Sequence, residues 1–227
     1  MRVRVALLLV VLALGAAPPV SAQGVAVAGR LTILEKNRKP AKDLGAAVIW
    51  LEGPGPGPVA RTDLRDVAID DKVYVPRVLV VPVGATVRFP NHDPFRHNVF
   101  SVSEPNQFDL GLYGRGEAKT WTFAHPGLVR VFCNVHPRMV AYVHVMATHH
   151  YAQPGADGTF TVRDVRPGRY VLHAWHERVA ADAVQEVVVG AAGVTDLQLT
   201  LDARGYKWQQ HPDKYGGNYS GGGRERY

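Results

Sequence analysis

Residues 128–145 read LVRVFCNVHPRMVAYVHV. Apolar side chains alternate with others up to Cys133, a turn containing Pro137 follows, and a second alternating run begins near Met139. Alternation with a period of two is typical of β-strands, so this stretch predicts two strands joined by a tight turn. Cys133, His136 and Met139 lie on that turn with two residues between each pair, and all three side chains can bind a metal.

The chemistry of these three side chains favours copper. Cys133 is the only cysteine of the chain. A thiolate and imidazoles suit both copper and zinc, but zinc rarely accepts methionine, whereas two histidines, one cysteine and a distant axial methionine form the blue-copper arrangement. Cys133, His136 and Met139 would supply three of these four ligands, so a second histidine must come from another segment.

Three histidines upstream of Cys133 are candidates for the fourth ligand. His92 lies in the turn 90–94, His125 lies in a Pro-Gly turn, and His97 begins the predicted strand 97–101. We prefer His97, because a sheet holds a ligand at the mouth of a strand more firmly than a turn does. The predicted metal ligands are therefore His97, Cys133, His136 and Met139.

With these residues the chain resembles the cupredoxins. The resemblance covers roughly residues 62–148 and rests on Phe89-Pro90-Asn91, His97-Asn98, Pro126-Gly127 and the run from Phe132 to Met139. The short ligand loop is most similar to that of the amicyanins, and the chain looks like the exported, plastocyanin-like proteins called "methylamine utilization" proteins.

This resemblance implies a Greek-key β-sandwich with one type 1 copper per chain. It further implies that Asn98 ties the two ligand loops together by hydrogen bonds and that the edge of His136 reaches the surface. The expected function is the transfer of single electrons between redox partners, such as a cytochrome or a dehydrogenase.

The residues around Cys133 favour a carrier over an enzyme. Its neighbours are Phe132 and Asn134, and no His-x-His pair occurs that could lead to a second copper cluster. Copper binding for tolerance or delivery is the alternative, and a structural sandwich with a coincidental motif is a third possibility. The chain has only three methionines and no Met-rich tract, which argues against a copper chaperone.

The flanking segments predict a second β-sandwich. Strand-like runs occur at 25–34, 46–51, 159–162, 169–175, 183–189 and 194–201, whereas 103–118 is expected to be a long loop. Residues 24–53 and 156–202 together resemble a carboxypeptidase regulatory-like (transthyretin-like) sandwich, so the chain is expected to be all-β, with the copper domain 62–148 inserted in a loop of the second sandwich. The alternative is a linear order in which the first strands extend the copper domain.

The two ends of the chain have distinct compositions. Residues 1–22 have a basic start, an apolar stretch and a Val20-Ser21-Ala22 cleavage signal, which predicts a signal peptide and a periplasmic mature protein. No later segment approaches ~20 apolar residues, so no membrane span is expected. Residues 203–227, rich in Gly, Tyr and charge, are expected to form a flexible tail.

The remaining charges and histidines suggest no further site. The formal net charge is +6, and no run of like charges suggests a nucleic-acid partner. A second metal site at His173, His176 and Glu177 is disfavoured, because strand residues three apart face opposite ways. His149 and His150 are expected to be solvated.

Overall fold

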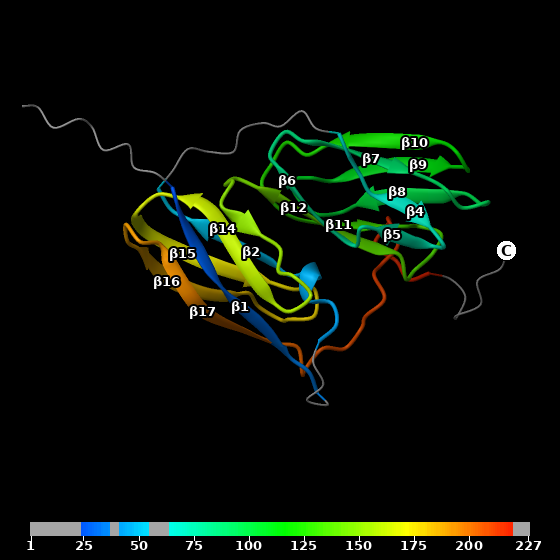
Figure 1. Cartoon of the computed structure of the whole chain (residues 1–227). Helices are drawn as coiled ribbons and strands as arrows, with labels where there is room; N and C mark the ends of the chain where they lie inside the picture. The colour runs from blue at the N-terminus through cyan, green and yellow to red at the C-terminus, as the bar shows by residue number, and fades with distance from the viewer. Residues whose placement is uncertain (1–23, 37–40, 55–63, 220–227) are drawn as a thin grey trace, which may run out of the picture.

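The computed structural model describes residues 24–36, 41–54 and 64–219, and the predicted signal peptide lies outside them. In these ranges the chain is all-β, with strands β1 to β17 and one short 3-10 turn, Leu44–Ala46. The strands surround two large hydrophobic cores and so form two lobes (Figure 1).

The central lobe is built from consecutive strands of the middle of the chain. One sheet has the order β6-β12-β11-β8-β9 and faces a smaller sheet, β10-β7-β3, with the hairpin β4-β5 beside them. The strands are β3 (Arg65–Asp66), β4 (Ala68–Asp70), β5 (Val73–Val75), β6 (Val78–Pro82), β7 (Thr86–Pro90), β8 (His97–Ser101), β9 (Phe108–Tyr113), β10 (Ala118–Thr122), β11 (Gly127–Phe132) and β12 (Val140–Met146).

The split lobe takes strands from both sides of the central lobe in sequence. Its sheets have the orders β14-β1-β17 and β13-β2-β15-β16, so the two N-terminal strands pair with strands that follow β12. The strands are β1 (Val25–Leu34), β2 (Val48–Glu52), β13 (Tyr151–Ala152), β14 (Thr159–Val165), β15 (Gly168–Trp175), β16 (Ala183–Val189) and β17 (Val194–Asp202).

A small apolar cluster and one ion pair join the two lobes. Val48 and Trp175 of the split lobe pack with Val78 and Met146 of the central lobe. Beside them, Arg77 donates two hydrogen bonds to the carboxylate of Glu177, at 2.5 and 2.7 Å. The lobes therefore contact each other through β2 and the end of β15 on the split lobe and through β6 and β12 on the central lobe.

The expected long loop at 103–118 was wrong, because it contains β9 and the start of β10. Gly111 has φ 68°, and the pairing of β8 with β9 shifts register between Asn98 and Phe100. This irregularity breaks the alternation that identifies a strand in sequence: Phe108 and Tyr113 are buried, whereas Leu112 is exposed.

The segment after β17 leaves the split lobe and runs to the central lobe (Figure 1). Its described part, residues 203–219, includes His211, whose ring stacks on Phe132 with centroids 4.2 Å apart. Lys214 forms an ion pair with Asp109 at 2.6 Å. The sequence predicted a flexible tail here, but these residues have specific partners on the central lobe.

Candidate metal centre

The loop between β11 and β12 carries three of the predicted ligands, Cys133, His136 and Met139. The hairpin pairs Phe132 with Val140, and the Cys133 N–H points at the Met139 carbonyl at 3.4 Å. Within the loop, Met139 N–H donates to the His136 carbonyl at 3.0 Å. These contacts close the loop tightly, so Cys133 and His136 face the same side.

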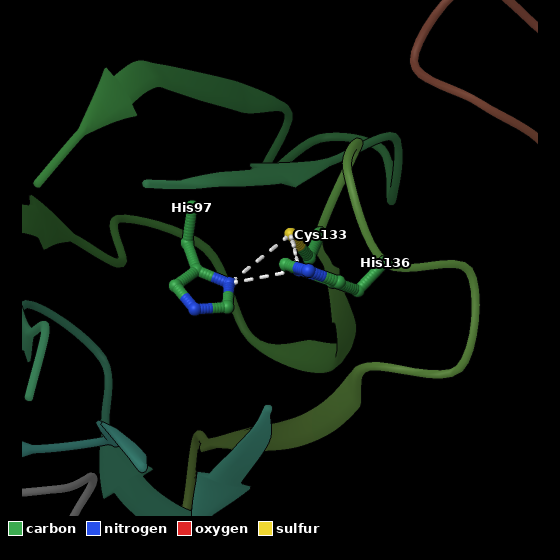
Figure 2. Close-up of side chains that lie close together, drawn as sticks. All are labelled: His97, Cys133 and His136. Atoms are coloured by element: carbon green, nitrogen blue, oxygen red, sulfur yellow. Dashed lines mark hydrogen bonds between the residues drawn. The ribbon is translucent and has the colours of Figure 1, made fainter. Parts of the chain in front are cut away.

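His97 comes from the neighbouring strand. It begins β8, which pairs with β11 through Phe100 and Phe132. The adjacency of these strands brings His97 to Cys133 and His136, and the ligating atoms of the three side chains lie within 4.8 Å of one another (Figure 2).

The three atoms form a triangle that fits a metal ion. Cys133 Sγ lies 3.7 Å from His97 Nδ1 and 3.6 Å from His136 Nδ1, and the two nitrogens are 3.1 Å apart. The circle through these atoms has a radius of about 2.0 Å, close to metal–nitrogen and slightly below metal–sulfur bond lengths of ~2.0 and ~2.3 Å. An ion at bonding distance therefore fits close to the plane of the triangle, as in trigonal His2Cys copper sites.

The cluster is shielded from solvent. His97 and Cys133 are 0% exposed and His136 is 5% exposed, so His136 has the only measurable surface of the three. Met139 is 1% exposed and belongs to the same hydrophobic core as Cys133. Its role as the fourth ligand remains a prediction.

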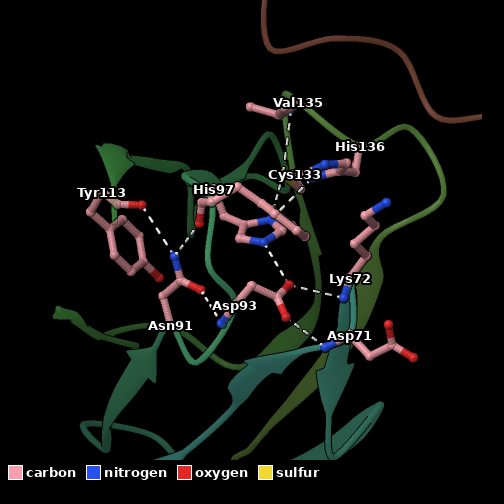
Figure 3. Close-up of polar contacts among 10 residues, drawn as sticks. Asp71, Lys72, Asn91, Asp93, His97, Tyr113, Cys133, Val135 and His136 are labelled. Carbon is pink, nitrogen blue, oxygen red and sulfur yellow. Dashed lines mark hydrogen bonds and ion pairs between the residues drawn. The ribbon is translucent and has the colours of Figure 1, made fainter. Parts of the chain in front are cut away.

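Asp93 fixes the orientation of His97. Its Oδ2 lies 2.8 Å from His97 Nε2, and its carboxylate also accepts the backbone N–H groups of Asp71 and Lys72 at 2.7 and 3.0 Å (Figure 3). Burial pulls the pKa of Asp93 upward, but these hydrogen bonds outweigh burial and lower it. The ionised carboxylate accepts the Nε2–H of His97, which leaves Nδ1 unprotonated and able to bind a metal.

The surroundings keep His97 neutral and only partly favour the thiolate of Cys133. Burial lowers the pKa of His97 despite the neighbouring Asp93. Burial raises the pKa of the Cys133 thiol, whereas backbone N–H groups of Val135, Asn98 and His136 lower it in part. A bound cation is the partner that makes a buried thiolate stable.

Asn98 connects the strand of His97 to Cys133 through its backbone N–H and not directly through its side chain. Asn98 Nδ2 donates to Asp109 Oδ1 of the next strand, at 2.7 Å, and Asn98 Oδ1 has no hydrogen-bond partner among the described residues. Strand alternation explains the difference, because it turns Asn98 away from the side on which His97 meets Cys133. The backbone N–H of Asn98, rather than its side chain, acts on the sulfur.

The other candidate histidines lie elsewhere. His92 and His125 are exposed, and neither joins the cluster. His173 stacks on Trp50 with centroids 4.8 Å apart, while His176 lies 3.4 Å from Asp43. In the described ranges, no other group of three or more His, Cys, Asp or Glu residues could hold a metal ion.

The histidine pair 149 and 150 is only partly solvated. His149 is exposed, but His150 is buried, and its Nε2 lies 3.2 Å from the Asp164 carbonyl. The expectation that both are solvated was therefore wrong for His150, which is a structural residue of the split lobe.

Two contributors to the site were missed in the sequence. The role of Asp93 depends on the turn between β4 and β5, where Asp71 and Lys72 adopt φ 49° and 56° and direct their N–H groups at its carboxylate. The second contributor is the C-terminal segment: Tyr219 OH donates to the Cys133 carbonyl at 3.0 Å. For these two contributors, the only local signal in the sequence was the predicted turn 90–94, which contains Asp93.

Comparison with known structures finds copper proteins. A purple cupredoxin from Nitrosopumilus maritimus is 26% identical, over 36% of this chain and 99% of that chain, with a TM-score of 0.33. The Cu(I) form of an amicyanin variant is 27% identical, over 43% of this chain and 99% of that chain, with a TM-score of 0.36. A copper-containing nitrite reductase from Thermus scotoductus is 26% identical, over 51% of this chain and 28% of that chain, with a TM-score of 0.36.

No protein-family profile and no curated protein matches the sequence. Within the part of the chain that the structure describes, no helix is long and apolar enough to cross a membrane.

Proposed function

We propose that this chain is a cupredoxin-like type 1 copper protein that carries single electrons between redox partners. The observation that supports it most directly is the triangle of His97 Nδ1, Cys133 Sγ and His136 Nδ1, whose size suits a trigonally bound ion. The buried thioether residue Met139 beside it favours copper over zinc.

The residues around the triangle suit electron transfer. When bound, copper would supply a one-electron couple between Cu(II) and Cu(I). His97 is fixed by Asp93, and Cys133 is fixed by the hairpin end, so the ligands have little freedom to rearrange when the charge changes. Burial excludes water, and His136, with the measurable exposure, is the residue through which we expect electrons to enter and leave.

A carrier is proposed rather than an enzyme. Phe132 and Asn134 flank Cys133, so no histidine beside the cysteine leads toward a second metal. The partner is proposed to be another redox protein. The chain itself is proposed to be periplasmic, a proposal that rests on the signal peptide expected at residues 1–22. The two lobes are proposed to be two domains, a cupredoxin-like domain inserted in a transthyretin-like sandwich.

Addition of copper(II) to the metal-free protein tests this function. We expect an intense thiolate-to-copper charge-transfer band in the visible spectrum, with one copper bound per chain. Cys133→Ser and His97→Gln should abolish the band, whereas His125→Gln, a matched change at an exposed histidine, should retain it. Colour that persists in Cys133→Ser would overturn the proposed site.

A second measurement separates electron transfer from copper tolerance or delivery. An electron carrier should show a reversible reduction potential and rapid electron exchange with a small cytochrome. A protein that binds copper only for tolerance should exchange electrons slowly.

A further inference from the structure

The C-terminal segment meets the central lobe next to the candidate metal centre. After β17 it leaves the split lobe, and its residues 211–219 contact β8, β9, β11 and the ligand loop (Figure 1). The ring of His211 stacks on Phe132, the residue before Cys133, and Tyr219 OH donates to the Cys133 carbonyl. The segment therefore contacts the backbone that carries the thiol.

Lys214 has one partner on the Cys133 loop and one on β9, the strand that pairs with the His97 strand β8. Its backbone N–H donates to Asn134 Oδ1 at 2.9 Å, and Asn134 directly follows Cys133. Its ammonium group donates to Asp109 Oδ2 at 2.6 Å, and the other oxygen of Asp109 accepts the side-chain N–H of Asn98, at 2.7 Å. Asn98 directly follows His97.

These contacts form a continuous chain between the two ligand segments. It runs from Asn134 through Lys214 and Asp109 to Asn98, so the strand end with His97 and the loop with Cys133 are linked by a residue from a third segment. Gly111 N–H also donates to Asp109, at 2.8 Å, which fixes the carboxylate in place. Three donors on one carboxylate leave it little freedom to turn away.

We propose that Lys214 is a positioning residue that clamps the Cys133 loop to the His97 strand and thereby holds the ligand triangle in shape. The clamp does not require copper to be present, because all of its contacts are between protein groups. Its effect on a bound metal rests on the proposed function, whereas its effect on the accessibility of the thiol does not.

The Cys133 thiol of the metal-free protein reports directly on the clamp. Because Cys133 is the only cysteine, its rate of modification by a disulfide reagent measures how often the buried loop opens. Lys214→Met removes the ion pair but keeps a long apolar side chain. We expect this variant to react roughly three- to tenfold faster, as loss of one or two hydrogen bonds predicts.

Lys207→Met is the matched control. Lys207 lies on the same segment and is exposed, and it forms no hydrogen bond or ion pair with either ligand segment among the described residues. We expect its labelling rate to stay within about twofold of the unsubstituted chain, well below the change that loss of a hydrogen bond predicts. Equal rates for Lys214→Met and Lys207→Met would overturn the clamp.

Asp109→Asn provides a second route to the same result. It removes the charge that Lys214 contacts and leaves an amide that can still accept from Asn98, so it should also speed labelling.

For the copper-loaded chain, Lys214→Met should release copper to a chelator faster by a similar factor, with Lys207→Met unchanged. Faster labelling without any blue colour would support the clamp and reject the copper function, whereas a blue protein with unchanged labelling would reject the clamp alone.

Discussion

The Oδ2 atom of Asp93 lies 2.8 Å from Nε2 of His97, and the two side chains are 5% and 0% exposed. Asp93 precedes His97 by four residues and sits outside the ligand triangle, yet it determines which ring nitrogen of His97 carries the proton. The binding nitrogen of His97 is therefore set by a residue that cannot itself reach the metal position.

Asp93→Asn should weaken copper binding. The amide removes the negative charge that stabilises the metal-binding tautomer of His97, and loss of such a partner typically costs 10- to 100-fold in metal affinity. A competition titration with a chelator measures the change. Asp70→Asn, at an exposed carboxylate of the β4-β5 hairpin that contacts Asp93, should leave the affinity unchanged. Equal affinities for both variants would contradict this role.

Met139→Leu tests the fourth ligand. The two side chains have similar volume, so we expect a stability loss below about 1.5 kcal/mol and a coloured site with three ligands. Removal of an axial thioether should raise the reduction potential, because the axial ligand tunes it. Met146→Leu is the control at another buried methionine. If both variants change the potential and spectrum equally, Met139 is a core residue only.

His144 should make the stability of the protein depend on pH. Burial lowers its pKa from 6.5 to about 4, so below pH 6.5 the unfolded chain binds a proton that the folded chain excludes. Its contribution is thus complete above pH 6.5 and is lost as pH falls toward 4. At pH 5 the loss amounts to about 2 kcal/mol.

Urea unfolding of the metal-free protein at pH 7 and pH 5 measures this effect. His144→Phe should keep the edge contact with Trp175 and lose about 2 kcal/mol less than the unsubstituted chain between the two pH values. His125→Phe, at an exposed histidine, should show the full loss. An unchanged pH dependence in His144→Phe would show that this residue is not its source.

Arg77 and Glu177 should stabilise the contact between the lobes. The side chain of Glu177 is 7% exposed, so Arg77→Met leaves a nearly buried carboxylate without its cation. Breaking a buried pair from one side costs about 3–5 kcal/mol, and the partial exposure of Arg77 reduces the expected loss to about 2 kcal/mol. Arg163→Met, at an exposed position, should cost less than about 0.5 kcal/mol.

A double-mutant cycle isolates this pair. Adding Glu177→Gln to Arg77→Met should recover part of the loss, because no charge is then left unpaired. If the losses of unfolding free energy in the two single variants simply add up in the double variant, the two side chains do not interact and the pair does not couple the lobes.

A cut between the lobes tests the proposed insertion. A protease site placed in the Pro-Gly stretch 53–58 should yield fragments that remain together under native conditions, since β1 pairs with β14 and β17. Size-exclusion chromatography distinguishes the outcomes: co-elution is expected until denaturant is added, and separation without denaturant would favour the linear order.

The ligand cluster could be predicted from sequence because its signals are local. Cys133 and His136 lie on one short loop, and His97 marks the start of a strand with clear composition. The strands 25–34 and 183–189 were likewise predicted to the residue, because their apolar content and flanking turns are clear. Local periodicity thus identified most of the strands and the centre of the site.

The parts that sequence did not reveal depend on distant or irregular structure. The register shift near Gly111 disrupts the alternating pattern of β9, so the sequence did not reveal this strand. The orientation of the Asp93 carboxylate depends on backbone N–H groups from a hairpin more than 20 residues upstream. Lys214 meets Asn134 across 80 residues of chain, and no spacing rule encodes such a contact. Only the folded arrangement brings these groups to the site.

The pairing of β1 with β17 has a consequence for the order of assembly. Val27 pairs with Val162 and Val194, whereas the pairings of the central lobe are all made between residues 65 and 146. Contacts that close long loops form slowly, so we expect the central lobe to fold before the split lobe closes. His97, Cys133 and His136 would then be assembled before Lys214 docks on the central lobe. The metal can enter the site most easily during this brief interval in the folding of each new chain.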